Sequence, residues 1–188
     1  MHDPSCAAPW TAARKVGGCV VLYQSLAEEL DALLRGETDP VANAANAAAA
    51  IYHSLPELNW AGFYFLRGEE LVLGPFQGQP ACVRIPLGKG VCGTAAAERR
   101  SMLVPDVHAF PGHITCDANS RSELVVPLLI KDGPTRDGLV EDCLLGVLDL
   151  DSPVTGRFDA ADQAGCEALA AIVVRHLAPC WTPRWAPR

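Results

Sequence analysis

NWAGFYFLRGEELVLGPF, residues 59–76, is the stretch in which the hydrophobic pattern of this 188-residue chain changes from helical to strand-like. Its two halves are runs of aromatic and branched residues, which favour strands, and the polar residues between them surround Gly68. This pattern predicts a β-hairpin with a three-residue loop, residues 67–69. Similar apolar runs predict further strands at residues 81–87, 101–105, 122–130 and 141–151.

Helical patterns lie on both sides of these strands. Leucines recur at helical spacing over residues 20–35. Asp39 and Pro40 are typical of an N-cap and a first helical position, and they predict an alanine-rich helix that ends before Pro56. A C-terminal helix is predicted to begin at Asp159, which starts a capping-box sequence. The order of elements predicts one α+β domain, with helices packed on an antiparallel sheet of about six strands.

Composition and charge limit the partners of the chain. Hydrophobic residues make up 49% and charged residues 20%, which is typical of a soluble globular protein, and no apolar run reaches the ~18 residues of a membrane span. The net charge of −7 leaves no basic surface, so we expect neither a nucleic-acid nor a membrane partner. Eight cysteines without a CxxC pair, and a start without the apolar core of a secretory signal, favour a cytoplasmic protein with mostly free thiols.

One long segment, residues 105–121, has no predicted secondary structure. It exceeds the roughly 12 to 15 residues of ordinary connections and holds a cysteine among histidines and acids, so we interpret it as a functional loop. Its Cys116 lies in a polar setting, whereas free cysteines are generally buried. His108 and His113 are also metal-binding residue types, but the paired spacing of zinc ligands is missing and we expect no metal.

Alternation along two strands predicts which side chains share a face of the sheet. Trp60 and Tyr64 flank Gly62, which favours either a slot between two rings or plain core packing. Asp149 and Asp151 stand about 6.5 to 7 Å apart along another strand, so repulsion would raise the pKa of one of them on a dry face. Asp151 alone is also typical of a turn, whereas Asp149 lies between two leucines.

A third acid, Glu123, begins the strand that directly follows the loop. It lies seven residues beyond Cys116 and is therefore expected near the same face. Aromatic walls, acids and a thiol around one pocket are the groups that an enzyme site requires.

Four long motifs connect these features. They are NWAGFYFL (59–66), LVLGPFQGQPACVRIPLGKGVCGTAAAE (71–98), PDVHAFPGHITCDANSRSELVVPL (105–128) and LLGVLDLDSP (144–153). Together they resemble the free methionine-(R)-sulfoxide reductases, small enzymes built on a GAF domain, and the likeness covers residues 20–178. The resemblance implies a homodimer and a GAF domain over residues 19–179, followed by a tail (180–188). Residues 1–18 are rich in Ala, Pro and Gly without periodicity, so we expect a loosely structured segment there.

The resemblance also implies roles for single residues. Cys116 would attack the sulfoxide, Cys82 would be the principal resolving cysteine, and Cys92 could form an alternative disulfide, although composition alone favours buried-core roles for Cys82 and Cys92. The implied reaction reduces the R epimer of free methionine sulfoxide without a bound cofactor. Thioredoxin, itself reduced by NADPH through thioredoxin reductase, would recycle the enzyme. The family's substrate-pocket positions fall on Trp60, Tyr64, Glu123, Asp149 and Asp151.

The residue types suit this reaction, because a sulfoxide sulfur is attacked readily only when its oxygen can take up protons. Cys116 would attack the sulfur while Glu123 or one of the Asp149/Asp151 pair donates a proton; which acid does so stays open. The products would be methionine and a sulfenic acid, which Cys82 would convert to a disulfide. The alternatives are a GAF module that binds a small molecule as a sensor, or one that reports oxidation through Cys116.

Overall fold

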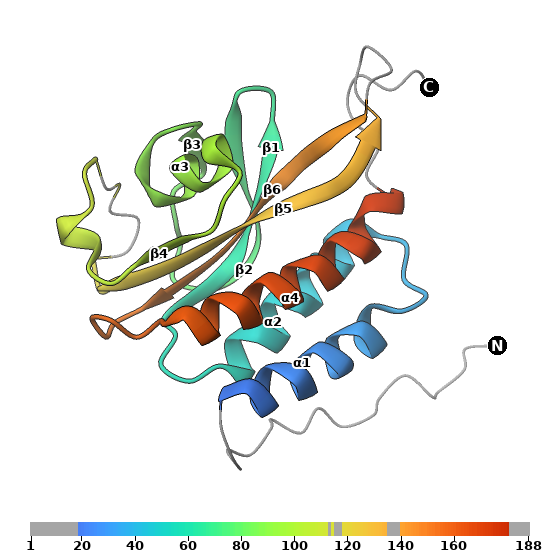
Figure 1. The fold of residues 1–188 in the computed structure, drawn as a ribbon, viewed down its shortest axis with the longest axis horizontal. Coiled ribbons are helices and arrows are strands. Elements are labelled where there is room, and N and C mark those ends of the chain that lie inside the picture. The colour runs from blue at the N-terminus through green and yellow to red at the C-terminus, as the bar shows by residue number, and fades with distance from the viewer. Residues whose placement is uncertain (1–18, 113, 115–117, 135–139, 181–188) are drawn as a thin grey trace.

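The computed structural model describes residues 19–112, 114, 118–134 and 140–180, and it shows a curved antiparallel sheet with helices on both faces (Figure 1). In this part of the chain the strands form one six-stranded sheet in the order β3-β2-β1-β6-β5-β4, which confirms the predicted α+β class. Helices α1, α2 and α4 pack together on one face, and α3 lies on the other (Figure 1). The helices are α1 (Cys19–Leu34), α2 (Pro40–Ser54), α3 (Gly90–Glu98) and α4 (Ala160–Leu177), with the 3-10 turns η1 (Val107–Ala109) and η2 (Ala178–Cys180); the strands are β1 (Trp60–Arg67), β2 (Glu70–Gly78), β3 (Arg84–Pro86), β4 (Met102–Val104), β5 (Ser122–Pro134) and β6 (Val140–Ser152).

The predicted helix starts are confirmed by their caps. The Asp39 carboxylate accepts hydrogen bonds from the N–H groups of Val41 and Ala42, at 2.8 and 2.9 Å, and so caps α2. Asp159 and Asp162 form a capping box at the start of α4. Each cap satisfies N–H groups that the first turn of a helix leaves without partners. None of the helices within the described ranges is long and apolar enough to cross a membrane.

Alternation along β1 divides the hydrophobic interior into two cores. Ala61, Phe63 and Phe65 belong to the larger core, between the sheet and helices α1, α2 and α4. Trp60 and Tyr64 belong to the second core, on the opposite face with α3. The predicted division of β1 into two faces is therefore confirmed.

The turn between β1 and β2 is shorter than predicted. Arg67 pairs with Glu70, so the turn holds two residues rather than three, and Gly68 has the left-handed φ of 69° that such a tight turn requires. The predicted strand 81–87 is also shorter, because only Arg84–Pro86 forms the ladder with β2. The apolar residues on either side of β3 pack against the second core without joining the sheet.

The ribbon of β5 and β6 is longer than predicted. The two strands pair as far as Pro134 and Val140, so residues 131–134 and 140 of the predicted loop 131–140 belong to strands. Residues 135–139 lie outside the described residues. Lys131 and Asp142 form an ion pair across the ribbon at 2.6 Å. Polar strand residues of this kind lack the apolar alternation by which strands are predicted, which explains the error.

The loop 105–121 was predicted to have no secondary structure, and this prediction is wrong for η1. The Asp106 carboxylate accepts a hydrogen bond from the His108 N–H at 3.0 Å and caps this short turn. Immediately before the loop, β4 pairs only with β5 and forms an edge of the sheet, as the sequence predicted. The loop therefore leaves from the sheet edge on one side and returns to β5 on the other.

Candidate active site

The register of the central strands brings three acids to one face of the sheet. In β6, Asp149 lies opposite Gly62 of β1, and Asp151 lies opposite Glu123 of β5. Because opposite residues of antiparallel strands point to the same side, the three acids share a face with Tyr64, two residues beyond Gly62. This face carries the second core and α3.

A cavity opens on this face. The empty space between its lining residues is about 390 Å³, a value that includes open solvent at the mouth. Val91 of α3 and Ile114 of the loop 105–121 contribute an apolar side, whereas the three acids contribute a polar one. Such a cavity suits a small ligand with an apolar part and an atom that can accept a proton.

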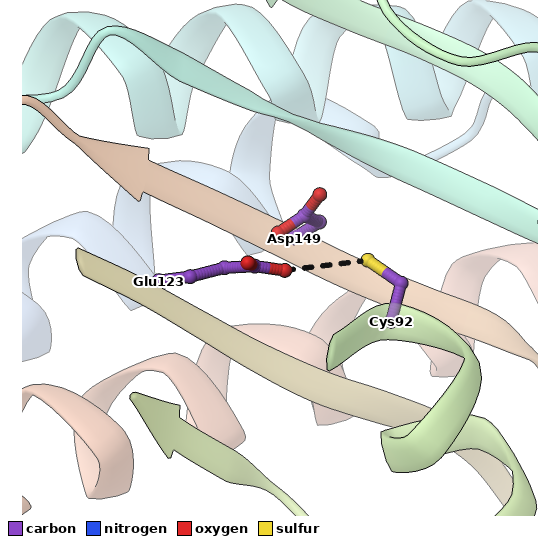
Figure 2. Close-up of side chains that lie close together, drawn as sticks. All are labelled: Cys92, Glu123 and Asp149. Atoms are coloured by element: carbon purple, nitrogen blue, oxygen red, sulfur yellow. Dashed lines mark hydrogen bonds between the residues drawn. The ribbon is translucent and has the colours of Figure 1, made fainter. Parts of the chain in front are cut away.

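A thiol and two carboxyl groups meet on the inner side of the cavity (Figure 2). The Cys92 thiol, which comes from α3, donates a hydrogen bond to Glu123 Oε1 at 3.7 Å. Cys92 Sγ and one carboxyl oxygen each from Glu123 and Asp149 all lie within 4.8 Å of one another. All three side chains are buried, and Asp149 Oδ1 has no hydrogen-bond partner within the described residues.

Burial raises the pKa of both buried acids, and repulsion adds to this effect at Glu123. Burial raises the pKa of Glu123 well above its usual value, and the negative charges of Asp149 and Asp151 raise it further. Burial also raises the pKa of Asp149 to about 7, although hydrogen bonds from Cys92 and Glu123 lower it. Glu123 therefore keeps its proton at neutral pH and donates it in a hydrogen bond to Asp149.

The pair that shares a proton differs from the pair that the sequence suggested. Asp149 and Asp151 project side by side from one strand, whereas Glu123 reaches Asp149 diagonally from the neighbouring strand. Burial, rather than repulsion by Asp151, raises the pKa of Asp149. Asp151 is half-buried and borders the cavity.

The thiol of Cys92 is held in its neutral form. Burial raises its pKa well above the usual value, and the negative charges of Asp149 and Glu123 act in the same direction. A neutral buried thiol is a weak nucleophile but a usable hydrogen-bond donor.

The space above Gly62 is filled, so of the two alternatives for Trp60 and Tyr64 the described structure shows core packing rather than a slot between two rings. A Cβ atom on Gly62 would lie 2.4 Å from Phe76 Cβ and 2.7 Å from the Trp60 ring. The Trp60 ring stacks on Phe76 at 5.3 Å and on Tyr64 at 5.8 Å between centroids. Tyr64 borders the cavity, and Trp60 supports it from behind. The predicted contact of Trp60 with a substrate stays a prediction.

Comparison with known proteins places this architecture in a family. The GAF domain model matches residues 12–177. The chain is 48% identical to the free methionine-R-sulfoxide reductase of Escherichia coli over 83% of its own length and 88% of that protein. It is 41% identical to the Saccharomyces cerevisiae enzyme of the same name over 81% of its length and 83% of that protein. The X-ray structure of free methionine-R-sulfoxide reductase from Neisseria meningitidis in complex with its substrate superposes with a TM-score of 0.78 at 38% identity, covering 90% of this chain and 96% of that one.

This chain belongs to the free methionine-R-sulfoxide reductases. The resemblance drawn from its sequence motifs is thus confirmed, together with the GAF fold.

The cysteines of this reductase differ in state. Cys82 is disulfide-bonded and lies half-buried between β2 and β3, whereas Cys92 and Cys143 are free thiols. Cys92 is therefore not the partner of Cys82, and it is buried, as its composition-based interpretation predicted. Cys116 and His113 lie outside the described residues, so the predicted place of Cys116 over the cavity stays a prediction.

Ser120 is a cavity residue of the reductase that the sequence analysis missed. Its buried hydroxyl accepts a hydrogen bond from Asn59 Nδ2 at 3.1 Å, and the residue borders the cavity. The next N–H group, that of Arg121, donates to the Ser152 carbonyl at 2.8 Å. These two bonds fix the end of the loop 105–121 to the sheet. A serine in a polar loop carries no sequence signal for such a role.

Proposed function

We propose that this chain reduces free L-methionine-(R)-sulfoxide to L-methionine in the cavity beside α3. The observation that carries the proposal is the buried Glu123–Asp149 pair, which holds a proton at neutral pH on the wall of a small cavity. Family membership supports it, as does the substrate complex solved for the N. meningitidis relative. The apolar side of the cavity suits the methyl and methylene groups next to the sulfur.

In the proposed first step the Cys116 thiolate attacks the sulfoxide sulfur while Glu123 donates its proton to the oxygen. The attack forms a bond between the two sulfurs. This bond and the S–O bond of the sulfoxide then break as the oxygen, with its proton, bonds to the sulfur of Cys116. Methionine sulfur is reduced by two electrons and Cys116 is oxidised by two, to a sulfenic acid. Asp149 accepts the hydrogen bond of Glu123 and so holds the protonated carboxyl in place. Glu123 regains its proton when reduction of the disulfide returns Cys116 as a thiol, which releases that proton as it becomes a thiolate again.

In the proposed second step the Cys82 thiol condenses with the sulfenic acid. The disulfide forms, the S–O bond breaks and water leaves. The disulfide-bonded state of Cys82 supports this assignment, and the buried, neutral thiol of Cys92 makes it the weaker candidate for resolution. Cys82 is half-buried, which is consistent with later reduction by an external dithiol such as thioredoxin.

A stereospecific assay tests the proposal. NADPH consumption coupled through thioredoxin reductase and thioredoxin is expected with free L-methionine-(R)-sulfoxide, and little is expected with the S epimer or with a peptide-bound sulfoxide. Equal rates with all three would exclude this substrate. Tight binding of the R epimer without turnover would favour a sensor.

A further inference from the structure

The segment that carries Cys82 is held by two aromatic side chains of β1. The Tyr64 hydroxyl donates a hydrogen bond to the Cys82 carbonyl at 3.0 Å. The Trp60 indole N–H donates to the Gln79 carbonyl at 3.2 Å. The segment 79–83 joins β2 to β3 and lies outside both strands, so these two bonds fix its path at two points.

Both donors are themselves held rigidly. Tyr64 and Trp60 are 1% and 2% exposed, and their rings form a continuous stack with Phe76. Burial raises the pKa of Tyr64, so its hydroxyl keeps the proton that it donates. A hydrogen bond from a rigid donor restricts the accepting backbone more than one from a side chain with free rotamers.

We propose that Tyr64 and Trp60 are positioning residues for the resolving step, which hold the Cys82 backbone where its sulfur can meet the oxidised cysteine. This inference rests on the resolving role proposed above for Cys82. The step needs no further oxidant, because the sulfenic acid supplies the oxidising equivalent and its oxygen leaves as water. The rate of a reaction between two groups on one chain depends on how closely they are held in the reactive geometry. Tyr64 also borders the cavity, so one side chain would link the substrate pocket to the resolving thiol.

The test compares Tyr64→Phe with Tyr23→Phe. Tyr64→Phe removes only the hydroxyl and keeps the ring on the cavity wall. Tyr23→Phe is the matched control, because it removes another buried tyrosine hydroxyl, which donates to Asp162 at 2.9 Å in the core on the opposite face. Trp60→Phe removes the second donor and tests whether the two bonds act in the same way.

The first readout separates the two chemical steps. The reduced enzyme is mixed with a limiting amount of free L-methionine-(R)-sulfoxide, and methionine release and disulfide formation are followed in the same reaction. In Tyr64→Phe the ratio of the rate of disulfide formation to that of methionine release should fall about fivefold, which corresponds to the ~1 kcal/mol of one neutral hydrogen bond. The sulfenic acid should then be trapped by dimedone in a larger fraction of molecules. Tyr23→Phe should leave the ratio at the wild-type value.

The second readout needs no sulfoxide. Each variant is equilibrated with mixtures of reduced and oxidised dithiothreitol, and the fraction of chains with the Cys82 disulfide is measured by mass spectrometry. The equilibrium constant for disulfide formation should fall about fivefold in Tyr64→Phe and stay unchanged in Tyr23→Phe. Failure of the stereospecific assay would thus refute the substrate while leaving this test intact. An unchanged ratio and equilibrium constant in Tyr64→Phe, or equal changes in both variants, would refute the positioning role.

Discussion

Replacement of Asp149 by asparagine is expected to stabilise the fold at neutral and alkaline pH while it impairs the proposed reaction. Burial raises the pKa of this carboxyl from 3.8 in the unfolded chain to about 7. The folded chain therefore holds the proton more tightly, and the stability linked to it is fully present below pH 3.8 and is lost as the pH rises to about 7. At 1.36 kcal/mol per pH unit, this loss is roughly 4 kcal/mol above pH 7.

Asparagine has nearly the same shape and stays neutral, so it lacks this loss. The free energy of unfolding of Asp149→Asn, measured with urea, should equal or fall below the wild-type value near pH 4 and exceed it near pH 8. The excess should approach roughly 4 kcal/mol, reduced by any weakening of the hydrogen bond from Glu123. A gain of stability at the cost of activity is typical of substitutions at functional sites.

Asp31→Asn is a control of opposite sign. Hydrogen bonds from His176 and Arg35 lower the pKa of the half-buried Asp31 to about 2. Its contribution to stability is therefore present above the unfolded pKa of 3.8 and is lost as the pH falls through about 2, so this substitution should destabilise near pH 8. An equal decrease in the free energy of unfolding of Asp149→Asn near pH 4 and near pH 8 would show that ionisation of the buried Asp149 does not destabilise the fold.

Substitutions at four further positions test the chemistry and the packing. Cys116→Ser should abolish methionine formation, and Cys82→Ser should release one methionine per chain and then stall; repeated turnover of Cys82→Ser with thioredoxin would transfer resolution to Cys92 or to the external thiol. The thiol of Cys92 lowers the pKa of Glu123 and Asp149 by hydrogen bonding, so in Cys92→Ala the pH above which activity declines should move upward. Cys92→Ser keeps a donor and should restore the wild-type pH–rate profile. Gly62→Ala places a Cβ 2.4 Å from Phe76 Cβ, and overpacking of this kind should lower the free energy of unfolding by about 1 to 3 kcal/mol in urea titrations; an unchanged value would show that the second core can adjust.

The features that the sequence predicted well depend on local rules. The caps at Asp39 and Asp159 need only the residues of one helical turn, and the two faces of β1 follow from alternation alone. The interpretation of a slot above Gly62 is wrong because of a residue on another strand. A bulge between Gly62 and Tyr64 shifts the register with β2, so that Phe76 lies opposite Gly62 and its side chain occupies the space. Nothing within 59–66 indicates where that bulge falls.

In the candidate site, too, local sequence rules did not predict the contacts between residues on different strands. Alternation placed Asp149 and Asp151 on one face. The closer pair, Glu123 and Asp149, depends on the register between the consecutive strands β5 and β6, which two irregularities within their ribbon shift. The hydrogen bonds from Tyr64 and Trp60 to backbone carbonyls have no signature, because any residue presents a carbonyl. Sequence thus indicated which groups gather, whereas the contacts between them required the fold.

The buried acids lie on central strands, whereas Cys82 lies in a connection between strands, and each position has a chemical reason. A proton donor works at neutral pH only if its surroundings stay dry and fixed, and the central strands β5 and β6 supply such surroundings for Glu123 and Asp149. In the proposed reaction the resolving thiol of Cys82 meets first another cysteine and then an external dithiol, and its place in a connection between strands suits this role. The hydrogen bond from the Tyr64 hydroxyl to the Cys82 carbonyl joins the rigid strand β1 to this connection, so the connection is held in place although it lies outside the sheet. The larger core on the opposite face then supplies the stability that offsets the cost of burying the acids.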